Sequence, residues 1–415
     1  MAFSAIIFCA AILSTSDPSP AQTINPAQQQ ISLPGSPFAA ITTADGRYVF
    51  VSLVITPTTG GVAVIRQRKN SATIKGIIST CGSAHGMAIS KGGRYLLVAV
   101  QSGSCTSGGV QFIDVRKAIA GDPNAVLGTV PTDSTAIEVA ISPDNKNVFV
   151  ANEFSGGRTC ENPREGAAPT PDTVSVIDFQ EALSSGQSPS SITATIPLDC
   201  GVVGLAVSSD NRYLYVTNET ALPTRPFFDS TVCNIPDGSS CPIVTSPGAV
   251  GTLDVVDIGR AASNPAGSVV ANIPAGCSPT RVILTHKDKI AWVSARDENN
   301  LLAFNAIDII TNPAALPLST MPVGIEPDGV QPFSNGRFYA VANTNRFDSC
   351  PAAGGTVSIL KVGKGLYTKT VGTFDAGVFP RQWALSPNGR LLYLTEFGSD
   401  ILAIFPVSSI VDQVQ

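Results

Sequence analysis

Charged side chains and one histidine recur at matching places along this chain, at the two ends of short apolar runs. The residues that open such runs are His85, Glu138, Arg281 and Arg381. The residues that close neighbouring runs are Glu153, Glu219, Arg296 and Glu396. Opposed carboxylates and guanidiniums bind a carboxylate or polarise a carbonyl group, and a histidine or a glutamate of raised pKa moves protons. We take the first set as candidate catalytic residues and the second as candidate ligand-binding residues. The alternative, that they pair with one another and only line a wet channel, stays open.

Several other chemistries find no support in the sequence. The two histidines, His85 and His286, are too few for a multi-histidine metal centre, and no C-x-x-C pair, Asp-rich calcium loop or nucleotide-binding glycine loop occurs. A G-x-S-x-G nucleophile elbow is missing too. No metal and no cofactor is therefore expected. Asn218-Glu219-Thr220 is the one glycosylation sequon. A glycan on Asn218 would crowd the candidate site, which leaves open that Asn218 is buried.

The composition narrows the class of protein. Of 415 residues, 43% are hydrophobic and 14% charged, with 37 glycines and 31 prolines. So much apolar surface disfavours disorder, and the frequent turn residues disfavour a helical bundle. The 26 basic and 31 acidic residues give a net charge of −5, so nothing indicates a nucleic-acid partner. After the first segment, no run is long and apolar enough for a membrane span.

One pattern, a strand-like run, a polar turn and a second strand-like run, occurs seven times. The copies cover residues 39–52, 87–100, 139–152, 205–218, 282–295, 331–343 and 383–396. Pairs such as Asp45-Gly46 and Asn388-Gly389 supply the positive φ that short hairpin turns need. A third run follows each variable loop, as in 173–179, and a fourth leads back, as in 72–78. Four strands in seven units predict an all-β fold, a seven-bladed β-propeller of four-stranded blades.

The two ends of the chain fit one closed ring. After residues 401–406 no fourth strand is evident for the last unit, whereas 29–33 (QQISL) precede the first unit. We expect this mature N-terminal strand to complete blade seven, because joining the ends removes an exposed sheet edge. Residues 22–415 are therefore expected to form a single domain, and a ring without free edges is expected to be a monomer.

The repeats resemble the YVTN family of β-propellers. Residues 215–218 read Tyr-Val-Thr-Asn, which is the family signature, and 149–152 (FVAN) and 339–343 (YAVAN) are close variants. The third-strand endings Val176-Ile177-Asp178 and Val255-Val256-Asp257 match as well. The resemblance covers nearly the whole mature chain and implies the propeller fold. Its superfamily contains binding and surface-layer proteins, lactonases and quinoprotein dehydrogenase subunits, so it does not select a function.

The N-terminus and the cysteines indicate export. Residues 2–13 are small and apolar but too few to span a bilayer, and a polar, proline-containing stretch follows. Residues 1–21 are therefore expected to be a secretory signal peptide, with an extracellular or periplasmic mature protein. Eight cysteines remain, and an even number in an exported chain predicts disulfides. The expected pairs, all on the face of the candidate site, are Cys81–Cys105, Cys160–Cys200, Cys233–Cys241 and Cys277–Cys350.

The loops after the second strands of units three and four, residues 154–172 and 220–250, are long and contain cysteines. Such loops are usually functional when ordered, although they can also serve stability alone. The first interpretation is a secreted, disulfide-braced propeller that binds a small molecule, a glycan or a protein on this face. The alternative is a lactonase-like hydrolase, cyclase or isomerase of a small-molecule ring that uses the Glu/Arg/His cluster. A quinoprotein is less favoured, because Trp292 and Trp383 lie within strands as core residues do.

Overall fold

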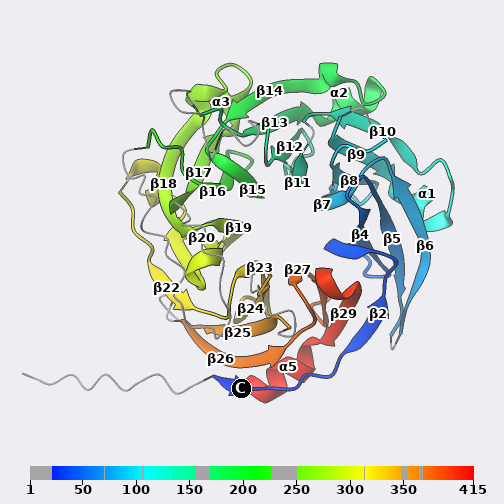
Figure 1. Ribbon diagram of the computed structural model, residues 1–415, viewed down its shortest axis with the longest axis vertical. Helices are drawn as coiled ribbons and strands as arrows, with labels where there is room; N and C mark the ends of the chain where they lie inside the picture. Colours follow the sequence, from blue (N-terminus) through cyan, green and yellow to red (C-terminus); the bar gives the residue numbers. More distant parts are fainter. Residues whose placement is uncertain are drawn as a thin grey trace, which may run out of the picture.

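The computed structural model describes residues 21–69, 71–104, 107–133, 135–155, 160, 169–225, 250–312, 314–346, 354–363, 366 and 368–415. These residues form seven antiparallel sheets arranged as blades around a central axis (Figure 1). Each blade has four strands, and one blade gains a short fifth. The predicted all-β, seven-bladed propeller is therefore confirmed.

Each blade runs from an inner strand at the axis to an outer strand at the rim. Blade one contains β3 (Ser36–Thr42), β4 (Tyr48–Thr56), β5 (Thr59–Gln67) and β6 (Ala72–Thr80). Blade two contains β7 (Ala84–Ile89), β8 (Tyr95–Val100), β9 (Gly109–Asp114) and β10 (Val126–Pro131). Blade three contains β11 (Ala136–Ile141), β12 (Asn147–Asn152), β13 (Thr173–Asp178) and β14 (Ile192–Pro197). Blade four contains β15 (Cys200–Val207), β16 (Tyr213–Thr220), β17 (Val250–Asp257) and β18 (Val269–Cys277).

The remaining blades follow the same order. Blade five contains β19 (Pro279–Thr285), β20 (Ile290–Ala295), β21 (Asn300–Asn305) and β22 (Ser319–Pro322). Blade six contains β23 (Pro327–Phe333), β24 (Phe338–Asn343), β25 (Thr356–Val362) and β26 (Thr368–Asp375). Blade seven contains β27 (Pro380–Leu385), β28 (Leu391–Glu396), β29 (Ile401–Pro406) and the N-terminal β2 (Gln29–Ser32). The face on which inner strands begin and second strands end is called the loop face, and the face with the inner hairpin turns the turn face.

The second strands are buried along nearly their whole length, because each blade packs between two others. β12 (sequence NVFVAN) and β20 (IAWVSA) show this, and Trp292 of β20 is fully buried. Trp383 is buried as well. Such packing explains the continuous apolar runs in these strands, where a sheet with one solvated face would alternate polar and apolar residues.

Short helices follow several third strands, and the sequence did not indicate them. They are α1 (Val115–Ala120), α2 (Phe179–Ser184), α3 (Ile258–Ala261) and α4 (Asp308–Thr311). Single 3₁₀ turns occupy Pro189–Ser191, Ala266–Ser268, Arg296–Glu298 and Phe397–Ser399. The predicted third strand 173–179 ends one residue early, since Asp178 caps α2 by accepting from the amide of Glu181. An aspartate at this position is a helix N-cap, which signals the end of the strand.

The N-terminal residues close the ring. β2 pairs antiparallel with β29, so that Gln29 lies opposite Ile404. In addition β1 (Gln22–Thr23) adds a fifth, parallel strand to blade six beside β26. The C-terminal helix α5 (Val407–Val414) packs at the same place, and Figure 1 shows the blue N-terminal strand running beside the red helix. The structure thus contains the expected closing strand and, beyond it, a second N-terminal strand.

Residues 1–20 lie outside the described residues, and with them almost all of the predicted signal peptide. No helix in the described ranges has the length and apolar character that a membrane span requires.

Candidate functional site

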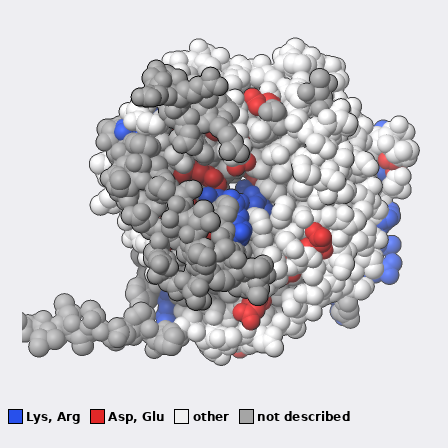
Figure 2. Space-filling model, viewed as in Figure 1, with Lys and Arg blue, Asp and Glu red and all other residues white. Residues whose placement is uncertain are grey.

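The four candidate catalytic residues all lie at the beginning of inner strands, at the loop face. His85, Glu138, Arg281 and Arg381 belong to β7, β11, β19 and β27. In each of these strands a β-bulge at this point interrupts the pairing with the second strand. A bulge re-aims side chains locally, so the charged residues are directed to the axis. Figure 2 shows acidic and basic side chains of the described residues gathered at the centre of this face.

Arg281 lies between two carboxylates and links them. Its Nη1 donates to Glu138, and its Nε donates to Asp328 Oδ1 at 3.0 Å. Arg381 approaches the other oxygen of Asp328, with its Nε 3.7 Å from Oδ2. Gln382 Nε2 donates to Glu138 at 3.3 Å. These side chains of blades three, five, six and seven form one continuous chain of polar contacts across the axis.

Asp328 and Gln382 were not among the residues selected from the sequence. Asp328 occupies in β23 the place that Arg381 has in β27, five residues before the hairpin turn. This position in the repeat could have indicated Asp328, but the copy in blade six matches the repeat pattern weakly on its first strand. A glycine provides room for the network, since a Cβ on Gly86 would lie 2.1 Å from Glu138 Oε1.

The charges of this network stabilise one another. Burial alone would raise the pKa of Asp328, but Arg281 and Arg381 lower it below its ordinary value. Burial lowers the pKa of Arg381 to about 10. Asp328 opposes this shift, but the neighbouring guanidiniums of Arg281 and Arg346 add to it. The Arg381 guanidinium also lies 3.7 Å from the centre of the Phe38 ring, a cation–π contact that partly replaces water.

A second ionic group lies beside the first. Arg296 Nη1 donates to Glu219 at 2.6 Å, and its Nε donates to Asp297 at 3.0 Å. Burial would lower the pKa of Arg296, but Glu219 and Asp297 raise it above its ordinary value. Ser278 Oγ donates to the second oxygen of Asp297 at 2.6 Å. The candidate binding residues Glu219 and Arg296 are therefore direct partners.

The two ionic groups enclose one small cavity. It is lined by Ile137, Glu153, Val203, Glu219, Thr280, Arg281, Arg296, Asp328, Arg346 and Arg381. Its volume among the described residues is about 20 Å³, which is room for about one water molecule. Four guanidiniums thus face a space that accepts one water or one small polar group. We call it the arginine cavity.

Glu153 is the carboxyl group of the arginine cavity that holds its proton most strongly. Desolvation and the nearby Glu219 raise its pKa to about 8, although three arginines oppose the rise. At neutral pH this side chain is therefore largely neutral and able to donate a hydrogen bond. Arg346 has a lowered pKa, because it is desolvated and stands near Arg296.

His85 is not placed to act on this cavity. It is buried, its Nε2 lies 3.0 Å from the Ser83 hydroxyl, and its Nδ1 has no hydrogen-bond partner among the described residues. Its ring packs edge-on to Phe38, with 4.6 Å between centroids. Burial and the nearby Arg381 lower the pKa of His85 to about 3, whereas a catalytic base needs a pKa near the working pH. The imidazole is a neutral packing group.

Glu396 also stands apart from the arginine cavity. It ends β28 and is almost completely buried, and its Oε1 accepts from the Gly377 amide at 3.0 Å. Burial raises its pKa. Of the four candidate binding residues, the structure therefore brings together Glu153, Glu219 and Arg296, and leaves Glu396 as a support of its own blade.

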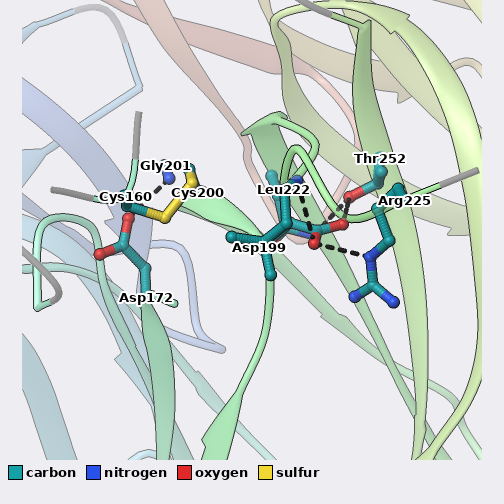
Figure 3. Close-up of a disulfide and its surroundings, with 9 residues drawn as sticks. Cys160, Asp172, Asp199, Cys200, Gly201, Leu222, Arg225 and Thr252 are labelled. Carbon is teal, nitrogen blue, oxygen red and sulfur yellow. Dashed lines mark hydrogen bonds and ion pairs between the residues drawn. A yellow bond between two sulfur atoms is a disulfide. The ribbon is translucent and has the colours of Figure 1, made fainter. Parts of the chain in front are cut away.

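A disulfide joins blades three and four on the loop face. Cys160, between β12 and β13, is bonded to Cys200 at the start of β15, with 5.6 Å between their Cα atoms. Beside it Asp172 accepts from the Gly201 amide at 2.7 Å (Figure 3). Cys81 and Cys277 are disulfide-bonded too. The expected partners Cys105 and Cys350, and the expected pair Cys233–Cys241, lie outside the described residues.

Behind this disulfide, blade four contains two buried aspartates. Asp199 accepts from Arg225 at 2.8 Å and from Thr252 at 2.9 Å (Figure 3). Asn272 donates to both Asp199 and Asp254. Burial and the nearby Asp199 raise the pKa of Asp254 to about 8. Because amides and one arginine satisfy these oxygens, we interpret the pair as internal bracing of the blade.

Asn218, the predicted glycosylation residue, has a structural role instead. It is completely buried, and its Nδ2 donates to Thr252 at 2.9 Å and to Asp254 at 3.0 Å. Asn152 and Asn343 make the same pair of bonds to the third strands of blades three and six. This amide nitrogen cannot carry a glycan without breaking the contact. The asparagine of the Tyr-Val-Thr-Asn pattern thus ties second strand to third.

Within the described ranges, no group of three or more His, Cys, Asp or Glu side chains is placed to hold a metal ion.

Neither the protein-family models nor the curated proteins contain a match to this chain. The fold and the arginine cavity are therefore the basis for any functional assignment.

Proposed function

We propose that this propeller is a binding protein, and that its loop face takes a small molecule or glycan that carries a carboxylate. The observation that carries the proposal is the arginine cavity, where four guanidiniums meet a space of about 20 Å³. A carboxylate oxygen can replace the water that fits there, because charge-assisted hydrogen bonds to arginine are strong. The remainder of such a ligand would lie above, toward the connections of blades three and four.

Charge balance supports an anionic ligand. Arg346 and Arg381 both have lowered pKa values, because they are desolvated and near other guanidiniums. An added anion relieves that repulsion. Glu153, neutral at pH 7 through its raised pKa of about 8, would donate to the ligand and would repel it once ionised. Carboxylate binding should therefore weaken as the pH rises through about 8.

The arrangement offers less to catalysis. The histidine is buried against Phe38, and Glu138 and Arg281 are engaged with each other. One observation does favour the alternative, a lactonase-like enzyme: the protonated Glu153 beside arginines is a potential general acid. The two functions are separable by experiment.

Calorimetric titration with glucuronate tests the binding function. Glucose, which lacks the carboxylate, is the uncharged control ligand. We expect glucuronate to bind and glucose not to bind. Arg346→Met should weaken glucuronate at least tenfold. A matched control is Arg337→Met, because Arg337 also lies 5.5 Å from a phenylalanine ring but on the turn face; it should bind like the parent protein.

Lactone opening, followed by acid release in a pH-stat over aldono-, aryl- and alkyl-lactones, tests the alternative. Turnover that disappears in Arg281→Ala, without carboxylate binding, would establish the enzyme. No binding of glucuronate and no turnover would contradict both functions.

We further propose that the chain belongs with the YVTN-type propellers, that residues 1–21 are a signal peptide and that the exported domain is a monomer. The disulfides on the loop face support export, because such bonds persist in oxidising compartments. The shared bonds of Asn152, Asn218 and Asn343 support the family resemblance.

A further inference from the structure

The hairpin turns of the turn face are joined from blade to blade by one repeated contact. The side chain three residues after the Ser or Thr that opens a turn reaches back to the turn of the preceding blade. Asn145 accepts from the Lys91 amide at 2.9 Å, and Asn211 accepts from the Asp144 amide at 3.1 Å. Asp288 accepts from the Ser209 amide at 2.6 Å. We call each of these contacts a clasp.

In the described turns the clasps join blades two to five only. At the same position blades one, two, six and seven have Gly46, Gly93, Gly336 and Gly389. Glycine has no side chain with which to reach the preceding turn. Among the described turn residues, no hydrogen bond joins the turn of blade five to that of blade six, or the turn of blade six to that of blade seven.

A pocket of about 800 Å³ lies among the turns of blades five, six and seven, in one part of the turn face without clasps. Ligand pockets commonly measure about 300–1,000 Å³. Its lining residues come from blades five, six and seven, and they are Leu284, Thr285, His286, Lys287, Pro332, Phe333, Ser334, Asn335, Gly336, Tyr339, Leu385, Pro387, Asn388 and Gly389. We call it the turn-face pocket. It lies at the opposite end of the axis from the arginine cavity.

The turn-face pocket has two leucines in a largely polar lining, with a cation at its rim. Leu284 and Leu385 are partly exposed and supply aliphatic surface, and Lys287 supplies a positive charge. Its lining contains no Asp or Glu. The one carboxylate of the blade-five turn, Asp288, is engaged by Ser209.

His286 lies beside Lys287 at this rim. Trp292 Nε1 donates to Thr285 Oγ1 at 3.1 Å, and the Thr285 hydroxyl shares a hydrogen bond of 3.1 Å with His286 Nδ1. The imidazole thus adds a second polar group to the ammonium of Lys287.

The backbone of the blade-five turn is held in an unusual form. His286, Lys287 and Asp288 have φ values of 54°, 59° and 60°, and each non-glycine residue in this region costs about 1 kcal/mol. Their amides donate no hydrogen bond within the described residues. Successive unpaired amides in a turn form concave sites that favour anions.

We propose that the turn-face pocket is a second binding site, which takes an organic anion with an apolar body, such as a monocarboxylate with an aliphatic chain. The body packs on Leu284 and Leu385, and the anionic group meets Lys287 and the His286 imidazole. Gly336 and Gly389 line this pocket without a side chain to fill it.

Calorimetry with octanoate tests the site, with octan-1-ol as the uncharged match. We expect octanoate to bind saturably and at least tenfold more tightly than octanol. Lys287→Gln should reduce octanoate affinity several-fold. Equal binding of the two compounds, or no saturable binding of octanoate, would overturn the proposal.

Substitution of the glycines gives a sharper comparison. Gly336→Asn and Gly389→Asn restore a clasp-type side chain, and neither position has an atom within 4 Å of an added Cβ. Asparagine tolerates their positive φ of 74° and 69°. We expect each to weaken octanoate about tenfold. Gly93→Asn, at the same turn position in blade two with φ 70° and equal space, should not; equal affinity of all three variants would refute the site.

The loop face provides the remaining control. Loss of octanoate binding in Arg346→Met would place octanoate in the arginine cavity and would overturn the turn-face site. Loss of glucuronate binding alone in that variant leaves the turn-face site standing.

Discussion

At the loop face the inner strands begin with Glu138, Arg281 and Arg381, and ionic contacts hold these side chains in place. At the turn face neighbouring blades are joined by clasps, whose side chains are neutral or carry a single charge. The loop face has paired ions around room for one water molecule. The turn face has clasps on one side and a pocket of about 800 Å³ on the other. The same seven repeats thus produce one closed end with buried ions and one partly open end.

The difference shows how a repeat protein localises a site. An ionic network requires different residues in each copy, so the loop face diverges from blade to blade. The turn face keeps one motif and varies it at a single position, which holds Asn145, Asn211 and Asp288 in blades three to five and glycine in the other four blades. The turn-face pocket lies beside two of these glycines, Gly336 and Gly389.

The largest effect should come from the centre of the loop face. Arg281→Met leaves Glu138 and Asp328 buried without their shared guanidinium, and unpairing a buried ion costs about 3–5 kcal/mol. Urea unfolding should show this loss of stability. Arg390→Met, an exposed arginine of the turn face, should change stability by less than about 0.5 kcal/mol; equal effects would mean that the network does not stabilise the fold.

Removal of the Cys160–Cys200 disulfide should be the next largest effect. The double change Cys160→Ser and Cys200→Ser should lower the free energy of unfolding by about 2–4 kcal/mol, mainly because the unfolded chain gains freedom. Thermal unfolding measures it. An unchanged midpoint temperature of unfolding would show that Asp172, Asp199 and their partners hold blades three and four together without the covalent bond.

The third effect depends on pH. The folded-state pKa of Glu153 is raised from 4.5 to about 8, so the folded protein binds a proton that the unfolded chain releases between those values. Wild-type stability should therefore fall as pH rises from about 4.5 to 8, by about 1–3 kcal/mol. Glu153→Gln should reduce this slope in urea titrations at pH 5, 7 and 9, and Asp254, whose pKa is also raised to about 8, should account for the slope that remains. Parallel slopes would contradict the assignment of a neutral Glu153.

A single clasp should have the smallest effect. Asn211→Gly preserves a residue suited to φ 62° and removes the bond to the Asp144 amide. We expect a loss of about 0.5–1.5 kcal/mol. Asn335→Gly is the matched change, because Asn335 has φ 58° and makes no clasp. If the two variants lose the same stability, the clasps contribute nothing beyond backbone conformation.

The repeats made the fold predictable from sequence, because alternating turn residues and buried second strands leave a strong periodic pattern. The closing strand at Gln29 followed from counting strands, since blade seven lacked one. The helix α5 and the pairing of β1 with β26 gave no comparable signal. Each depends on packing between the two ends of the chain, which local sequence does not encode.

The site was predicted only in outline. Glu138, Arg281 and Arg381 meet because each begins an inner strand, and that position could be read from the repeats. His85 shares the position but is shielded by Phe38, whose ring also lies against Arg381. Asp328 escaped notice because its repeat was recognised only from Gln331 onward. Side-chain partners across the axis depend on three-dimensional distance, which the repeat register alone does not give.

The N-terminal closing strand has a consequence for how the protein is made. β2 is translated before blades one to six, yet its partner β29 is translated after them. The nascent chain can build blades one to six progressively, but blade seven cannot be completed before β29 has been made. Such distant pairing is slow to form. A polypeptide that stopped short of β29 would be left with an unpaired β2 and an open sheet edge, which is a template for pairing with other chains.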